Sequence, residues 1–180
     1  MKNLVWLLIF IPVLTFAQQK SEVVELSGKS AGELYRNAKE YLVINNKPGN
    51  LIIQIDNPSE QKIVSSGVKN IRYSLQNYPT YIDVNYAISL QFKEGKFEYS
   101  VYIKSIKYED GFELSYDDFK SITTKEGWES YVKKTGIKPV VNKNVATEGN
   151  KKVYALLKKN IDGLISDLTN YLRNGKQINW

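Results

Sequence analysis

The sequence predicts a two-layer α+β fold, in which an antiparallel sheet of about five strands carries helices on one face. Two patterns lead to this prediction. Apolar and polar residues alternate from Tyr81 to Tyr108 around a turn at Glu94-Gly95, which is typical of a half-buried hairpin. Apolar residues then recur at helical spacing from Val153 to Leu172. Because an apolar helical stripe needs a partner, we expect it to pack on the apolar face of the sheet.

The hairpin pattern also predicts how its two strands pair. A two-residue loop at Glu94-Gly95 places the apolar residues of both strands on one face, and a slip by one residue would destroy this arrangement. The pairs expected on the core face are Phe92–Phe97, Leu90–Tyr99, Ile88–Val101 and Tyr86–Ile103. The pairs expected on the opposite, open face are Gln91–Glu98, Ser89–Ser100, Ala87–Tyr102, Asn85–Lys104 and Asp83–Ile106.

Shorter signals predict the elements before the hairpin. The run from Ser21 to Leu26 is rich in β-branched residues and predicts a first strand. An S-x-x-E capping pattern begins at Ser30 and predicts a helix that continues to about Ile44. Two further strands are expected at Leu51–Ile55 and Ile63–Leu75, and Gly67 is a candidate bulge position in the second.

The C-terminal part of the chain gives one strong signal and one weak one. Residues 109–148 are expected to form an irregular connection with one short helix around Trp128 to Lys134, because glycines and a proline interrupt them. The stripe that follows predicts a final helix at residues 150–173, which Asn174-Gly175 stops. The predicted order is therefore strand, helix, four strands and helix.

The first seventeen residues are typical of a secretory signal peptide. Lys2 supplies the positive charge, Leu4 to Leu14 is an apolar run, and Thr15-Phe16-Ala17 is a small-x-small ending. A membrane-spanning helix is the alternative, but spanning needs about 20 apolar residues and this run is shorter and contains Pro12. We therefore expect cleavage after Ala17, a single domain at residues 18–180, no membrane span after cleavage, and a periplasmic or secreted protein.

The amino-acid composition excludes several kinds of active site and metal site. Its 180 residues include no His and no Cys, so a Ser-His-Asp triad, a thiol nucleophile, a disulfide and an ordinary zinc site are excluded. The formal net charge is +6, but of the 25 basic residues only Arg36, Arg72 and Arg173 are arginines. Because base and minor-groove readout depends on clustered basic residues, arginine above all, we expect no nucleic-acid partner. We also expect no cofactor and no catalytic residues.

The order of elements and several motifs resemble a family of secreted bacterial proteins of unknown function with a TBP-like fold. The residues that carry the resemblance are the G-x-S-A-x-E-L-Y motif from Gly28 to Tyr35, the following Ala38 to Leu42, and the pair of strands marked by Asp56, Lys62-Ile63-Val64 and Gly67. The likeness covers residues 20 to 108 and, more loosely, the last helix. It implies a single TBP-like repeat and no catalytic residues.

Two polar groups of residues are candidate sites. Asp110, Glu113, Asp117 and Asp118 could hold Ca²⁺ or act as an acid–base pair, but their spacing matches no calcium loop, so we interpret them as a polar loop. The lysines of the last helix lie opposite its apolar stripe, and we interpret them as its solvated face.

Three functions of different classes stay open. The first is a monomeric, non-catalytic module that binds a protein or an envelope component through the open face of the sheet, with Asn85, Tyr102 and Lys104 as candidate binding residues. The second is a carboxylate-based hydrolase of envelope glycans, which would need two carboxylates facing each other across a cleft. The third is a carrier of an apolar ligand with a helix-grip-like fold, which six or seven strands would favour. We favour the first.

Overall fold

The computed structural model describes residues 20–45, 51–75, 78–138 and 142–175. The predicted signal peptide lies outside these residues. The strands are β1 (Lys20–Glu25), β2 (Leu51–Asn57), β3 (Lys62–Leu75), β4 (Tyr78–Lys93), β5 (Lys96–Tyr108) and β6 (Glu113–Ser115). The helices are α1 (Ala31–Ile44), α2 (Tyr116–Ser121), α3 (Lys125–Thr135) and α4 (Lys143–Asn174).

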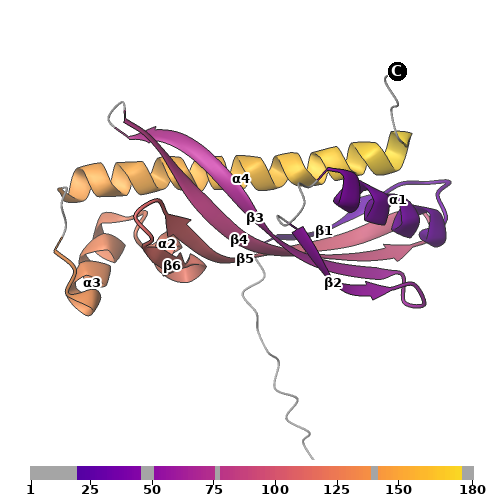
Figure 1. Cartoon of the computed structure of the whole chain (residues 1–180), viewed down its shortest axis with the longest axis horizontal. Helices are drawn as coiled ribbons and strands as arrows, with labels where there is room; N and C mark the ends of the chain where they lie inside the picture. The colour runs from indigo at the N-terminus through magenta and orange to yellow at the C-terminus, as the bar shows by residue number, and fades with distance from the viewer. Residues whose placement is uncertain (1–19, 46–50, 76–77, 139–141, 176–180) are drawn as a thin grey trace, which may run out of the picture.

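The structure confirms the predicted α+β class and its open antiparallel sheet. The strand order is β1-β5-β4-β3-β2, and β6 is a sixth strand of three residues that pairs with Ser105 to Lys107 of β5. Six strands is the number expected of the helix-grip-like carrier, but five of them form one open path and β6 only adds a short pair beside it. The long helix α4 runs along the whole sheet, with α1 at one end of the molecule and α2 and α3 at the other (Figure 1). The sequence prediction missed β6, since three residues with one buried side chain give no readable alternation.

The predicted hairpin register is confirmed from the turn to the pair Tyr86–Ile103. Beyond that pair the register shifts by one residue, and Asn85 faces Ser105. The predicted pairing of Asn85 with Lys104 is therefore wrong.

A bulge in β5 causes the shift, and Lys104 is the extra residue. The predicted pair Asp83–Ile106 is wrong for the same reason, because Asp83 faces Lys107. Without the bulge, alternation would leave Ile106 on the open face. With it, Ile106 returns to the core and is fully buried.

Gly67 does not form the bulge expected there. It pairs regularly with Leu51 on one side and Tyr86 on the other, while the irregularity between β2 and β3 lies between Ile53 and Ile55. Alternation places Gly67 on the core face, so the sheet has no side chain at that position beside Tyr86.

The stretch 109–148 is more regular than its sequence suggested. It contains β6, α2, α3 and the start of α4, so the predicted irregular connection is corrected to short elements separated by turns. The short helix expected around Trp128 is confirmed as α3, and the last helix begins at Lys143 rather than at residue 150. Each helix has a side-chain N-cap, namely Ser115, Thr124 and Asn142.

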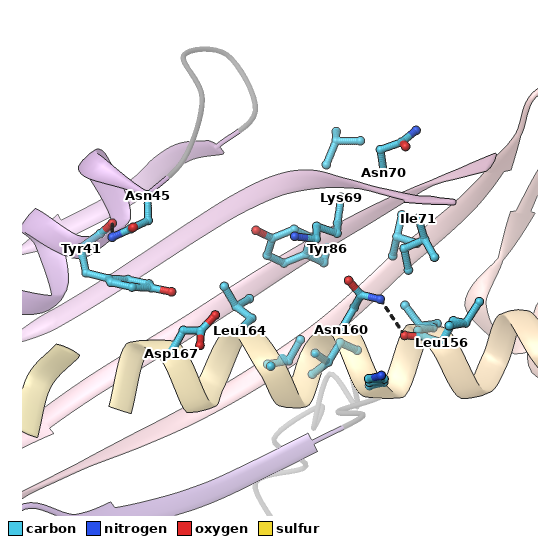
Figure 2. Close-up of a pocket in the computed structure, with 17 residues that line it drawn as sticks. Tyr41, Asn45, Lys69, Asn70, Ile71, Tyr86, Leu156, Asn160, Leu164 and Asp167 are labelled. Atoms are coloured by element: carbon cyan, nitrogen blue, oxygen red, sulfur yellow. Dashed lines mark hydrogen bonds between the residues drawn. The ribbon is translucent and has the colours of Figure 1, made fainter. Parts of the chain in front are cut away.

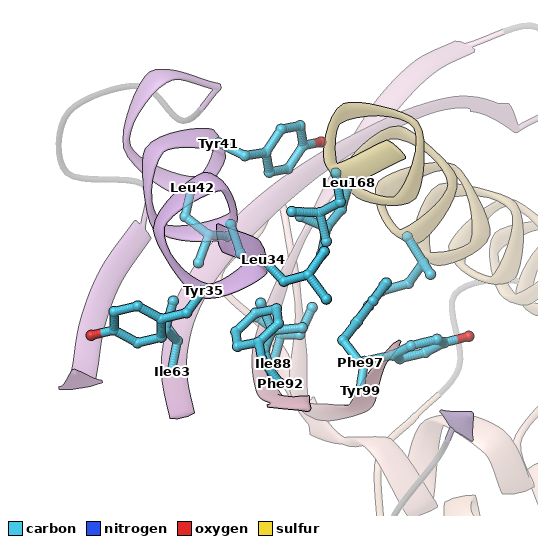
Figure 3. Packing of buried hydrophobic residues seen from close by; sticks show 14 of the residues in the cluster. Leu34, Tyr35, Tyr41, Leu42, Ile63, Ile88, Phe92, Phe97, Tyr99 and Leu168 are labelled. Carbon is cyan, nitrogen blue, oxygen red and sulfur yellow. The ribbon is translucent and has the colours of Figure 1, made fainter. Parts of the chain in front are cut away.

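The core consists of two apolar clusters on the helix side of the sheet. The first joins α1 and the C-terminal half of α4 to the turn end of the hairpin (Figure 3). The second joins α2 and the N-terminal half of α4 to the other end, where Phe119, Ile106 and Ile82 are fully buried. None of the described helices is long and apolar enough to cross a membrane.

Polar contacts tie β1 into the fold. The Tyr99 hydroxyl donates to Glu22 at 2.9 Å, and the Lys20 ammonium donates to Asp162 of α4 at 2.7 Å. The same ammonium lies 5.9 Å from the centroid of the Tyr99 ring. The first described residue of the chain is therefore attached to both layers.

Candidate functional site

The open face contains the three candidate binding residues, which lie near the β5 bulge. The side-chain amide of Asn85 donates to the Ser105 hydroxyl at 2.9 Å and lies 3.5 Å from Glu113 of β6, which accepts from Ser105. Tyr102 is half-buried opposite Ala87, and Lys104 is exposed. The structure thus brings Asn85 together with Ser105 and Glu113, while Lys104 makes no direct pair with it.

Exposed apolar side chains gather on the same face. The structure describes nine large apolar residues as exposed, and five of them lie on open-face positions of the strands, namely Val23, Ile52, Ile55, Val68 and Tyr81. Ile52 and Ile55 of β2 adjoin Val64 and Val68 of β3, and we call these four residues the open-face patch. Val68 pairs with Asn85, so the patch continues into the candidate residues.

This patch was not among the predicted binding residues, although the sequence contains a signal for it. In Leu51–Ile55, four of the five residues are apolar, so both faces of that short strand must carry apolar side chains. A half-buried edge strand would be expected to alternate instead. The apolar residues of β2 that face away from the core, Ile52 and Ile55, therefore form part of the open-face patch.

A groove of about 740 Å³ lies on the other side of the sheet, between α4 and the edge of β3 (Figure 2). Its lining includes members of both core clusters, and Ile161 of α4 packs against both. Val68 to Ile71 form its edge, Tyr41 and Tyr86 extend toward it from α1 and β4, and Leu156, Asn160 and Asp167 line it from α4. Gly163 of α4 also lines it, and an added Cβ there would have no heavy atom within 4 Å.

The two tyrosine hydroxyls of the groove are neutral donors at physiological pH. Burial, together with the nearby Asp167, raises the pKa of Tyr41 to about 12. Burial also raises the pKa of Tyr86. Asn160 uses one amide proton on the Leu156 carbonyl at 2.9 Å. The groove therefore combines apolar walls with hydroxyl and amide groups, one carboxylate, and the ammonium groups of Lys69 and Lys159.

A second hollow, of about 690 Å³, lies at the α3 end of the molecule. Four aromatic side chains line it: Tyr73, Tyr108, Phe112 and Trp128. The hydroxyl of Tyr108 donates to the buried Asn150 at 3.3 Å, which in turn donates to the Ile122 carbonyl at 3.3 Å. Residues from β3, β5, α3 and α4 meet here, so no single sequence pattern could have identified it.

Three of the four acidic residues of the DGFELSYDD segment have structural partners. Asp110 accepts from the Phe112 backbone at 3.0 Å, and Asp118 accepts from the Ser115 hydroxyl at 2.8 Å at the start of α2. Glu113 belongs to the Asn85 network. Within the described residues no three His, Cys, Asp or Glu side chains are grouped so as to hold a metal ion. Their interpretation as a polar loop is therefore refined to turn and capping roles.

Comparison with known proteins matches part of the chain to a protein family. Residues 21–109 match a family described as a domain of unknown function, DUF4468, with a TBP-like fold. The chain thus carries a DUF4468 segment. The resemblance seen in the sequence is confirmed, and the DUF4468 segment covers β1 to β5 together with α1.

Two solved structures share the fold over most of the chain. A DUF4468 family protein from Bacteroides ovatus ATCC 8483 has a TM-score of 0.64 at 15% sequence identity, covering 89% of this chain and 88% of that chain. A TBP-like protein from Parabacteroides distasonis ATCC 8503 has a TM-score of 0.56 at 12% identity, covering 87% and 93%. At these identities the likeness concerns the fold alone. No curated protein matches the chain in sequence.

Proposed function

We propose that the protein is an exported, non-catalytic module that binds a partner protein through the open face of its sheet. The observation that carries this proposal is the open-face patch of Ile52, Ile55, Val64 and Val68 beside Asn85. Contiguous apolar side chains on a rigid sheet, rimmed by hydrogen-bonding groups, are typical of a protein-binding surface.

The distribution of carboxylates favours binding over glycan hydrolysis. The groove under α4 contains one described carboxylate, Asp167. The aromatic hollow contains two, Glu109 and Asp110, but they are neighbours in sequence rather than residues facing each other across a cleft. A hydrolytic pair needs two carboxyl groups on opposite sides of the scissile bond.

The N-terminal sequence supports export, because its charge, apolar run and small-x-small ending are typical of a signal peptide. Cleavage after Ala17 would remove no described residue, since β1 begins at Lys20. N-terminal sequencing of the protein recovered from the envelope and culture fluid tests this step. We expect a chain that begins at Gln18, and an intact Met1 in the cytoplasm would contradict it.

Site-specific photocrosslinking tests the open-face assignment. A photoreactive amino acid at Ile52 samples the patch, and the same group at Val43 of α1 samples an apolar position outside it, with both native side chains 63% exposed. We expect a discrete adduct with one partner protein from position 52 and none from position 43. Equal labelling from both positions, or no adduct at position 52, would contradict the proposal.

Two substitutions then define the extent of the surface. Ile52→Lys places a charge within the patch and should abolish the adduct formed from a photoreactive group at Ile55, because a buried unpaired charge opposes docking. Replacing Asn85, Tyr102 and Lys104 together by Ala tests the candidate residues. An unchanged adduct in that triple variant would restrict the surface to the open-face patch.

A further inference from the structure

We propose that the unpaired edge of β3, together with the groove under α4, binds an extended acidic segment of a partner protein, which joins the sheet as an additional strand. This site lies on the helix side of the sheet edge. It does not depend on the open-face proposal.

Among the described residues, no strand pairs with the outer edge of β3 over its second half. β2 pairs with β3 only as far as Gly67, and within the described residues no strand lies on the outer side of Val68 to Leu75. The amide of Phe92 donates to the Gln61 carbonyl at 2.9 Å, and the β3–β4 register continues from there without a shift.

That hydrogen bond fixes which backbone groups point outward. In an antiparallel pair, alternate residues bond to one neighbour and the residues between them to the other. Because Gln61 bonds to β4, the odd-numbered residues of β3 do so as well. The even-numbered residues of the open half, namely Val68, Asn70, Arg72 and Ser74, therefore direct their N–H and C=O groups away from the sheet.

Such an edge selects an extended backbone. Only a polypeptide in β conformation places donors and acceptors at the spacing of this row, and its side chains then alternate between the two faces of the sheet. On the helix side they would enter the groove between Tyr86 of β4 and α4. The space left at Gly163 gives one of these side chains room beside the helix.

The charged residues of the groove indicate which side chains the bound segment contains. Lys69 and Lys159 line the groove against one carboxylate, that of Asp167. On the open face of the same edge the charges balance more closely, because Arg72 lines a hollow with Glu109. The excess of positive charge within the groove favours a partner whose groove-side residues include acidic side chains among apolar ones.

The same charges disfavour a second copy of this chain. Antiparallel pairing of two β3 edges about a two-fold axis at Lys69 would place the two copies of Lys69 opposite each other, and an axis at Arg72 would do the same with the two arginines. Like charges directly opposite each other destabilise a strand pair, and basic residues on an edge are a common protection against self-association.

The test uses a phage-displayed library of random linear nonapeptides, selected on the secreted form of the protein. Binding of each enriched peptide is then measured by fluorescence polarisation with matched variants. Asn70→Pro removes an outward N–H without breaking a bond to β4, and Asn70→Ala removes the same side chain but keeps the N–H. We expect enriched peptides with alternating apolar residues and at least one Asp or Glu. Their affinity should be at least about tenfold weaker for Asn70→Pro than for Asn70→Ala.

Two further variants keep the test decisive. Gly163→Leu fills the groove from α4 and should also weaken binding, even if Asn70→Pro fails to fold. Ile52→Lys alters the open-face patch and should leave peptide binding unchanged. Failure to enrich any peptide, equal affinity for the two Asn70 variants, or loss of binding in Ile52→Lys would overturn the proposal. Loss in Ile52→Lys would instead assign the peptides to the open face.

Discussion

The side-chain amide of Asn85 donates to the hydroxyl of Ser105, which faces it only because Lys104 bulges out of β5. Beyond the pair Tyr86–Ile103, this single extra residue determines which side chains of β5 lie on the open face and which lie on the core face. It aligns Asn85, Ser105 and Glu113 on the open face and returns Ile106 to the core.

Deleting Lys104 should therefore be tolerated. The remaining residues form a regular ladder in which Asn85 still faces Ser105, so we expect the free energy of unfolding in urea to change by no more than about 1 kcal/mol. Deleting Tyr102 is the control. It should cost about 3 kcal/mol or more, since the shortened strand brings Lys104 into the core position of Ile103. Similar losses for the two deletions would contradict the bulge assignment.

Asp56 should make the stability depend on pH. Lys39 and Tyr35 of α1 both donate to Asp56 of β2, and these hydrogen bonds lower the pKa of that carboxyl. A lowered pKa in the folded state gives stabilisation that is complete above the unfolded value of about 3.9 and lost as the pH falls through the folded value.

The variant Asp56→Asn should therefore melt at a lower temperature than the wild type at neutral pH, and the difference should shrink once the pH is below about 4. Glu98→Gln on the exposed part of β5 serves as the control. A difference in melting temperature that stays constant from pH 7 into the acid range would show that Asp56 does not act through its charge.

Ser65→Ala should stabilise the protein. The hydroxyl of Ser65 is fully buried and has no hydrogen-bond partner among the described residues. Burying an unpaired hydroxyl is unfavourable, so its removal should raise the free energy of unfolding by about 1 kcal/mol, or the melting temperature by roughly 2–4 °C. A lower melting temperature would mean that the hydroxyl has a partner, such as an internal water.

Two helical glycines should respond in opposite ways to replacement by alanine. At Gly163 the added Cβ has no heavy atom within 4 Å, so Gly163→Ala should stabilise α4 by about 1 kcal/mol. At Gly127 the Cβ would lie 2.0 Å from the Ser121 carbonyl oxygen, so Gly127→Ala should cost about 2 kcal/mol or more. Thermal melts of both variants give the comparison, and stabilisation at Gly127 would contradict the packing of α3 on α2.

The hairpin could be predicted from sequence because its turn and its alternation agree. Glu94-Gly95 fixes the loop, Gly95 takes the positive φ of 70° that such a turn needs, and the apolar residues then determine the register. The bulge could not be predicted. Nothing in Lys104-Ser105 distinguishes an extra residue from a paired one, and only the buried Ile106 further along the strand hinted at it.

The candidate sites were predicted less well than the fold, since each depends on segments that are distant in sequence. The described helices pack on the opposite face of the sheet, as predicted, and Asn85 and Tyr102 lie on the open face. The groove lies where the described part of β2 begins, opposite Gly67, while α4 continues past this point, and neither segment reveals this alone. The aromatic hollow likewise needs four elements to meet.

The attachment of β1 has a consequence for the order in which the chain can fold. Its contacts join residues that are far apart, with 77 positions between Glu22 and Tyr99 and 142 between Lys20 and Asp162. Contacts that close such long loops form late, whereas the β4–β5 hairpin needs only its own turn. A chain emerging N-terminus first from a membrane pore would hold its first strand unpaired until β5 had followed. The central hairpin would thus fold first, and β1, although it is made first, would join the sheet late.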